Sequence, residues 1–196
     1  MVVVDVETTG LSPARHGIIS IGAVEFEKPA NQFYGECQVE KHIEIDRAAL
    51  EVNGFTIEEI TKTDRPLPKI LAKDFYEWLK PIKDKTLGGH NTGFDAGMLR
   101  VAFGSARLKW PFGFRLIDMH ALAYGHMKSR GHTIPLIHDT SAISANTVHE
   151  YVGLPREPEP HNALVGAKME AEAMSRLLHG KSLLPEFRKY PLPPKF

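Results

Sequence analysis

Apolar, β-branched residues form three short runs near the start of this 196-residue chain, and turn-forming residues separate the runs. Short apolar runs between turn residues predict buried strands, and consecutive ones predict a meander. We therefore expect three neighbouring strands at the N-terminus. They are Met1–Val6, Ile18–Phe26 and Gln32–Ile43.

Helical spacing begins after residue 45 and then alternates with short strands. Residues 46–61 predict one or two short helices around Asn53-Gly54, and apolar residues in Leu67–Ile82 recur at the spacing of a core-facing helix. Strands followed by alternating helices and strands indicate an α/β domain with a mixed sheet. The later strands are expected at Thr86–His90 and Arg115–Ile117, and the later helices at Phe94–Phe103, His120–Met127, Ser144–Val152 and His161–Leu178.

The remaining segments are expected to be loops and a tail. Gly131–Ser141 has a loop-like composition, and Pro155–Pro160 is rich in proline. The last 16 residues contain four prolines, which predicts an extended segment on the surface. We therefore divide the chain into one domain, residues 1–180, and a Pro-rich tail, residues 181–196.

Charge neither supports nor excludes a nucleic-acid partner. The chain has 24 Lys and Arg against 24 Asp and Glu, so any basic face must be local. Residues 100–132 hold six basic residues and one acidic residue, which suits a phosphate-contacting surface and an ordinary solvated face equally well.

Cysteine content and hydropathy indicate a cytoplasmic protein that does not enter membranes. Cys37 is the only cysteine, so no internal disulfide and no zinc-type cysteine cluster is expected. No apolar run approaches the roughly 20 residues that span a bilayer, and no signal peptide precedes the first predicted strand.

The first candidate site is the pair Asp5 and Glu7 at the end of the first predicted strand. Alternation along a strand places both side chains on one face. Two buried carboxylates repel each other unless a cation pairs with them, and hard ions such as Mg²⁺ prefer oxygen ligands. The alternative is that both acids reach solvent at the strand end.

Two further segments carry candidate residues, each with an ordinary explanation of its own. Asp95 opens a predicted helix just after a strand, where an acidic residue also stabilises the helix dipole. His161 stands where the Pro-rich loop meets the last helix, a position from which an imidazole can take a proton from water. A lone histidine there can equally be a surface residue.

Taken together, these segments resemble the DnaQ-like DEDDh 3′–5′ exonuclease family, over residues 1 to about 178. The resemblance implies a ribonuclease H-like fold, an α/β structure with a mixed five-stranded sheet flanked by helices. The segments that carry it are Asp-Val-Glu-Thr-Thr-Gly-Leu at 5–11, Ile19–Val24, His90-Asn91 with Phe94-Asp95, Leu116–Asp118, Thr147–Gly153, and His161-x-Ala163-Leu164 with Ala167.

The family's chemistry implies a role for each matched residue. Two metal ions, Mg²⁺ or Mn²⁺, bridge the scissile phosphate at the 3′ end of DNA or RNA, and nucleoside monophosphates are released. Asp5, Glu7 and Asp95 are the expected metal ligands, and His161 is the expected general base. Single-stranded or 3′-terminal nucleic acid is the expected partner. The expected substrate-binding residues are Thr8, Thr9, Gly10, Leu11, Asn91 and Phe94.

Gly166 departs from this pattern, because the family has an aspartate five residues after the histidine. Glu170 lies one helical turn further on the same face, roughly 6 Å along the axis, which makes it a weak substitute. Three carboxylates in place of four predict weak metal binding and poor activity, and Gly166→Asp is expected to raise both.

Three functions therefore stay open from the sequence. They are an exonuclease, a degenerate exonuclease fold that binds nucleic acid or protein without cleaving, and a small-molecule-binding α/β domain with an incidental motif match. The choice between DNA and RNA depends on local geometry around the 2′-hydroxyl. Four aromatic residues are candidates for stacking on unpaired bases, with core packing as the alternative: Phe55, Trp110, Phe112 and Phe114.

Overall fold

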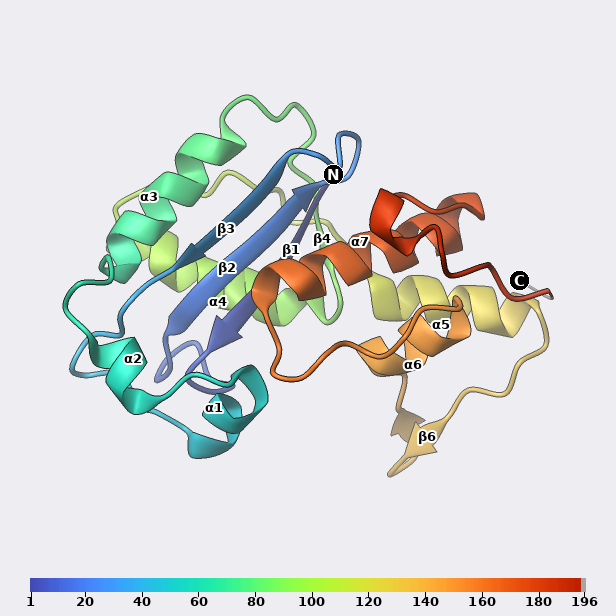
Figure 1. Cartoon of the computed structure of the whole chain (residues 1–196), viewed down its shortest axis with the longest axis horizontal. Coiled ribbons are helices and arrows are strands. Elements are labelled where there is room, and N and C mark those ends of the chain that lie inside the picture. Colours follow the sequence, from blue (N-terminus) through green and yellow to red (C-terminus); the bar gives the residue numbers. More distant parts are fainter. Residues whose placement is uncertain (195–196) are drawn as a thin grey trace.

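A five-stranded mixed sheet forms the centre of the computed structural model, which describes residues 1–194 (Figure 1). The strand order is β3-β2-β1-β4-β5. The first three strands pair antiparallel, whereas β4 and β5 run parallel to β1. This confirms the expected mixed sheet and ribonuclease H-like α/β fold. The strands are β1 Val2–Thr8, β2 Ile18–Glu25, β3 Gln32–Glu36, β4 Leu87–Gly89 and β5 Leu116–Asp118.

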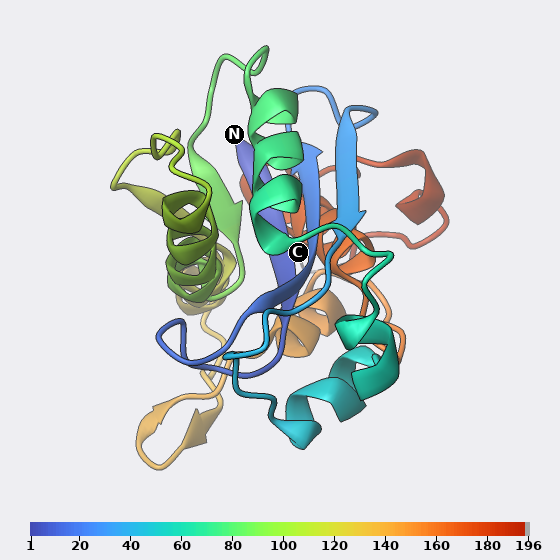
Figure 2. The same cartoon turned by 90° about the vertical axis from the view of Figure 1, so that its left-hand side faces the viewer.

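Helices cover both faces of the sheet. α3 and α4 pack on one face in a core with the even-numbered residues of β1, and α5, α6 and α7 build the core on the other (Figures 1 and 2). Two short helices, α1 and α2, lie beyond the end of β1 (Figure 2). The helices are α1 Arg47–Asn53, α2 Ile57–Thr61, α3 Pro68–Leu79, α4 Thr92–Ser105, α5 Met119–Ser129, α6 Ala145–Tyr151, α7 Ala163–His179 and a 3₁₀ turn, Pro185–Phe187.

A glycine in β2 allows α7 to begin directly against the sheet. A Cβ atom at Gly22 would lie 2.1 Å from the backbone carbonyl of Ala163 and 2.3 Å from the amide nitrogen of Leu164. Only glycine permits this approach of two backbones. Because Gly22 pairs with Asp5 across the β1–β2 ladder, the start of α7 comes to lie beside Asp5.

Two predicted elements differ from the structure. The third strand ends at Glu36 and not at Ile43, because its pairing with β2 extends only to Ser20. The segment Gly131–Ser141, expected to be a loop, contains a hairpin of two-residue strands, β6 (Leu136–Ile137) and β7 (Thr140–Ser141), projecting from the molecule (Figure 1). A hairpin of two-residue strands is too short to give an alternation signal.

A buried ion pair attaches the C-terminal segment to α7. Arg176 and Glu172 are 1% and 0% exposed, and Arg176 Nε donates to Glu172 Oε1 at 2.7 Å. The guanidinium also donates to the carbonyl oxygens of Phe187 and Tyr190, and Glu172 Oε2 accepts from the amide of Leu184 at 2.9 Å. The described part of the tail, up to residue 194, therefore packs against the domain through specific polar contacts.

Two sequence-based expectations concern membranes and the single cysteine. No helix within residues 1–194 is both long and apolar enough to cross a membrane. Cys37 is a buried free thiol. The cytoplasmic location inferred from the sequence stays a prediction.

His149 on α6 gives the fold a specific sensitivity to acid. Its ring is fully buried, and neither ring nitrogen has a hydrogen-bond partner among residues 1–194. Burial, with a smaller contribution from His90, lowers the pKa of His149 from 6.5 to about 4. The unfolded chain therefore binds more protons between pH 6.5 and 4, so the free energy of unfolding falls as pH drops through that window.

We expect His149→Leu to remove about 3 kcal/mol of this acid-induced loss of stability between pH 6.5 and 4. The measurement is urea unfolding at pH 7, 5.5 and 4, with His179→Leu on the exposed end of α7 as the control. Parallel pH curves for the wild type and His149→Leu would contradict the prediction.

Candidate active site

Asp5 and Glu7 face α7 from the end of β1. Alternation directs Val2, Val4 and Val6 into the core beneath α3 and α4, so the two acidic residues point to the opposite face. The register of the β1–β2 ladder shifts between Glu7 and Thr8, which re-aims the chain where the strand ends. The expected placement of both carboxylates on one face is thus what the backbone shows.

Asp95 is brought to the same strand from α4. Its carboxylate is buried, and its Oδ1 accepts a hydrogen bond from the backbone amide of Val6 at 3.1 Å. α4 begins just after β4, and the amide of Thr92 donates to Asp118 Oδ2 at the end of β5. The parallel strands β4 and β5 therefore fix the helix start that carries Asp95 against the middle of the Asp5–Glu7 pair.

Two more glutamates join this group, and sequence reasoning missed one of them. Glu157, in the loop between α6 and α7, has a side chain only 10% exposed, and its Oε1 has no hydrogen-bond partner among residues 1–194. Glu170 on α7 is 7% exposed, and its Oε2 is likewise without a partner. Sequence reasoning rated Glu170 a weak substitute and did not consider Glu157. The only local feature that pointed to Glu157 was its position four residues before His161.

A pocket of about 290 Å³ opens beside this group of acids, and Asp95 does not line it. Four of the acidic residues line it, together with His161 and apolar side chains from α1 and α4. The lining includes Asp5, Glu7, Glu157, Glu170, His161, Thr8, Leu11, Ala49, Val52, Asn53 and Phe94.

Burial disfavours the ionised forms of all five acids, and repulsion from neighbouring acids adds to this effect at all of them except Glu157. Burial raises the pKa of Asp5, Asp95 and Glu170 well above their usual range. Burial and the neighbouring charge of Glu157 raise the pKa of Glu7 to about 7, and burial also raises the pKa of Glu157. So much negative charge in one place is costly unless a cation neutralises it.

The side chains fit a divalent cation by their chemistry. Carboxylate oxygens are the ligands that Mg²⁺ and Mn²⁺ prefer, and two buried oxygens of this group have no hydrogen-bond partner in the part of the chain that the structure describes. Across residues 1–194, no three His, Cys, Asp or Glu side chains already stand in a coordinating arrangement. Ion binding would therefore require the carboxylates to turn toward a common point.

His161 lies at the mouth of the pocket with its side chain 31% exposed. Its Nδ1 lies 3.9 Å from Glu157 Oε2, and its backbone amide donates to the carbonyl of Val52 on α1. The next residue, Asn162, caps α7 by accepting from the amides of Leu164 and Val165. The imidazole is thus anchored by its backbone while its ring stays accessible to water.

The expected substrate-binding residues fall into two groups. Thr8, Leu11 and Phe94 line the pocket, and Leu11 projects with 80% of its side chain exposed. The hydroxyl of Thr9 is engaged with the carbonyl of Glu44 at 2.7 Å, and Gly10 and Asn91 do not line the pocket. Asn53 was missed, and its Nδ2 donates to the carbonyl of Thr8, which ties α1 to the strand end.

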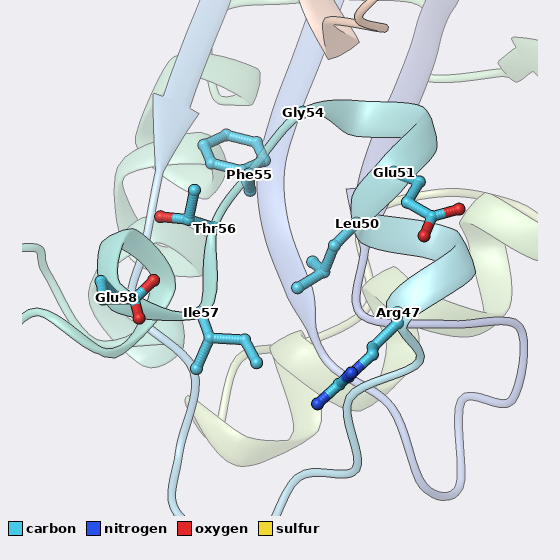
Figure 3. Close-up of a pocket in the computed structure, with 8 residues that line it drawn as sticks. All are labelled: Arg47, Leu50, Glu51, Gly54, Phe55, Thr56, Ile57 and Glu58. Atoms are coloured by element: carbon cyan, nitrogen blue, oxygen red, sulfur yellow. The ribbon is translucent and has the colours of Figure 1, made fainter.

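Most of the candidate stacking aromatics are used for packing. Phe112 is buried, and Trp110 packs on Phe103 with Arg100 over its ring. Phe55 lies in a separate pocket of about 390 Å³ between α1 and α2, and none of the five acids described above lines it (Figure 3). Phe114 is 93% exposed and is the one of the four that is free to stack.

Comparisons with known proteins identify the family of the chain. A family model described as an exonuclease matches residues 2–174. The chain is 29% identical over 175 residues to the 3′-5′ DNA exonuclease Cap18 of Escherichia coli, covering 86% of each chain. It is 30% identical over 180 residues to the PolC-type DNA polymerase III of Thermotoga maritima, covering 90% of this chain and 12% of that protein.

Solved structures share the fold at low sequence identity. E. coli Exonuclease I in complex with a dA16 oligonucleotide superposes with a TM-score of 0.69 and 16% identity, covering 92% of this chain and 40% of that one. Exonuclease I from Methylocaldum szegediense gives a TM-score of 0.70 with 15% identity, covering 92% and 41%. With the family model spanning most of its length, this chain belongs to the DnaQ-like exonuclease family of the ribonuclease H-like fold.

Proposed function

We propose that this chain is a 3′–5′ exonuclease that hydrolyses the terminal phosphodiester bond of single-stranded DNA with Mg²⁺ or Mn²⁺ bound. The observation that carries the proposal is the pocket in which Asp5, Glu7 and Glu170 face His161. Its relative Cap18 is a 3′-5′ DNA exonuclease, and E. coli Exonuclease I has been solved with single-stranded DNA and a zinc ion. These names favour DNA over RNA.

Asp5, Glu7 and Asp95 would hold the cations. Divalent ions in such a site lower the pKa of a bound water and stabilise the leaving oxygen of an in-line displacement. The protein's part is to hold the carboxylates on rigid elements: two on β1, and one on α4 with its Oδ1 bonded to Val6. Fixed positions of this kind supply much of the rate of such reactions.

His161 would act as general base from the pocket mouth. Its ring is accessible and lines the same pocket as Asp5 and Glu7, where an attacking water would lie. Leu11 and Phe94 offer apolar surface to the terminal nucleotide, with Thr8 beside them. Thr9, Gly10 and Asn91 would support the backbone around this contact.

The competing function is a binding module that has lost catalysis. Gly166 favours it, because the family's fourth acidic position has no side chain here. The weak metal binding expected from the sequence holds only if no other carboxylate takes that place. Glu157 and Glu170 are the two side chains that could replace the missing carboxylate.

The test is digestion of a 5′-labelled single-stranded DNA with Mn²⁺, beside Asp5→Ala and an EDTA control. We expect stepwise shortening from the 3′ end that a 3′-terminal phosphorothioate slows, with no shortening by Asp5→Ala. An RNA of the same sequence reports the sugar preference. Oligonucleotide binding without shortening, equal with and without Mn²⁺, would establish the binding module instead.

A further inference from the structure

We propose that Glu157 supplies the carboxylate ligand that the exonuclease family takes from the position of Gly166. The inference rests on the proposed function, because it concerns the same cation site. It adds a ligand from the loop between α6 and α7, a segment to which the family resemblance assigns no metal ligand.

The space beside Gly166 carries the first step. A Cβ atom at Gly166 would lie 2.1 Å from Asp5 Oδ2 and 3.2 Å from Glu157 Oε1. The volume that an aspartate side chain would need at this position is thus occupied by the oxygens of two other carboxylates. The missing side chain of Gly166 is what allows Glu157 to reach Asp5.

The environment of the Glu157 carboxylate carries the second step. The side chain is nine-tenths buried, yet its Oε1 has no partner among residues 1–194. The backbone amide of Glu157 donates to Asn146 Oδ1 at 2.9 Å, so the loop is held in place on α6. Glu157 Oε2 lies 3.9 Å from His161 Nδ1, so Oε1 is the oxygen left to face the other carboxylates. A buried carboxylate oxygen in that position is unfavourable without a cation to neutralise it.

Glu157 fits the vacant role better than Glu170 does. Glu157 Oε1 lies 3.2 Å from the position of a Cβ atom at Gly166, beside the place where the family has its acidic side chain. Glu170 Oε2 instead lies 3.3 Å from the position of a Cβ atom at Gly89 on β4. Glu170 therefore lies toward the β4 side of the group, while Glu157 occupies the side that Gly166 leaves open.

The first experiment measures Mn²⁺ affinity by isothermal titration calorimetry for the wild type and Glu157→Gln. Glu159→Gln is a matched control, because Glu159 is exposed in the same loop and both glutamates precede a proline. We expect Glu157→Gln to weaken Mn²⁺ binding by at least about 10-fold. Glu159→Gln is expected to bind within twofold of the wild type. Equal affinity of Glu157→Gln and the wild type would overturn the inference, as would a wild type that binds no Mn²⁺.

Thermal unfolding separates a ligand from a merely structural residue. In EDTA, Glu157→Gln should melt at or above the wild-type temperature, because the change removes one negative charge from a buried group of acidic side chains. In saturating Mn²⁺ the order should reverse, because the wild type gains more from the ion. A variant that melts lower under both conditions would show a structural role and overturn the inference.

The double variant Glu157→Ala/Gly166→Asp tests whether the two positions are alternatives. Once the shortened residue 157 leaves room beside residue 166, an aspartate at 166 should recover most of the Mn²⁺ affinity that Glu157→Ala alone loses. Gly166→Asp alone should add little, because Asp5 and Glu157 fill its space. The expectation from the sequence that Gly166→Asp raises metal binding is therefore limited to a chain in which residue 157 is no longer a glutamate. Equal gains in both backgrounds would overturn the inference.

The outcome for the proposed function is read separately. A wild type that binds Mn²⁺ through Glu157 but does not shorten DNA would refute the exonuclease and leave the ligand assignment standing. If the wild type shortens DNA but Glu157→Gln binds Mn²⁺ normally, the exonuclease proposal stands and the assignment of Glu157 as a ligand is refuted.

Discussion

Asp5→Asn is expected to reduce Mn²⁺-dependent DNA shortening by more than about 100-fold while it stabilises the cation-free protein. Asp5 interacts electrostatically with every other acid of the group. Asp95, Glu7 and Glu157 all act on its pKa, and Glu170 is affected by its charge. Asparagine keeps the shape of the side chain but removes the charge that a cation needs.

The stability gain should depend on pH in a defined direction. Burial first, and then the neighbouring acids, raise the pKa of Asp5 in the folded state. The wild type therefore carries no penalty below the unfolded pKa, and the penalty grows as pH rises through the folded pKa. In EDTA, urea unfolding should show Asp5→Asn clearly more stable than the wild type at pH 8, and nearly equal to it at pH 4.

Asp64→Asn provides the control, since Asp64 is exposed in the turn between α2 and α3. It should leave both cleavage and the free energy of unfolding unchanged at either pH. Full cleavage by Asp5→Asn would remove Asp5 from the cation site. If cation-free Asp5→Asn is less stable than the wild type at pH 8, the charge of Asp5 is not destabilised by burial and by its acidic neighbours.

Local patterns were enough to predict the strands that carry the site. The β-branched run at the N-terminus and the alternation within it placed Asp5 and Glu7 on one face, as the structure shows. The position of Asp95 just after a strand also follows from neighbouring residues alone. Each of these predictions depends on contacts within one element or between adjacent ones.

The rest of the site depends on contacts between distant segments. Sequence reasoning followed the register of α7 to Glu170, because a helix has a period, but a Pro-rich loop has none, so Glu157 gave no periodic signal. Its approach to Asp5 depends on Gly22, which lets α7 begin against the sheet, and on Asn146, which holds the loop. None of these relations can be obtained from the spacing of residues along the chain.

The buried pair Arg176 and Glu172 was missed for a similar reason. Both look like ordinary charged positions on a helix, and only the return of the C-terminal segment covers them. Their hydrogen bonds to Val152, Phe187, Tyr190, Leu183 and Leu184 join α6, α7 and the tail in one network. The tail that composition predicted to lie on the surface is thus part of what buries these charges.

Arg176→Met is expected to lower the free energy of unfolding by about 3–5 kcal/mol, because it leaves Glu172 buried without its cation. For a chain of this size that corresponds to a fall in melting temperature of roughly 10 °C. The tail should also become sensitive to limited proteolysis, since it loses the guanidinium contacts to Phe187 and Tyr190. Thermal unfolding and the cleavage pattern of residues 181–194 measure the two effects.

Two variants separate loss of the pair from loss of a surface charge. Arg156→Met breaks an exposed ion pair with Glu150, and should cost less than about 1 kcal/mol. Adding Glu172→Leu to Arg176→Met removes the stranded carboxylate and should recover much of the lost stability, because an apolar pair often replaces a buried ion pair at little cost. The tail should stay sensitive to protease in that double variant, because the hydrogen bonds from Arg176 are still absent. Full recovery of tail protection would instead mean that apolar packing, and not the guanidinium, holds the tail on α7.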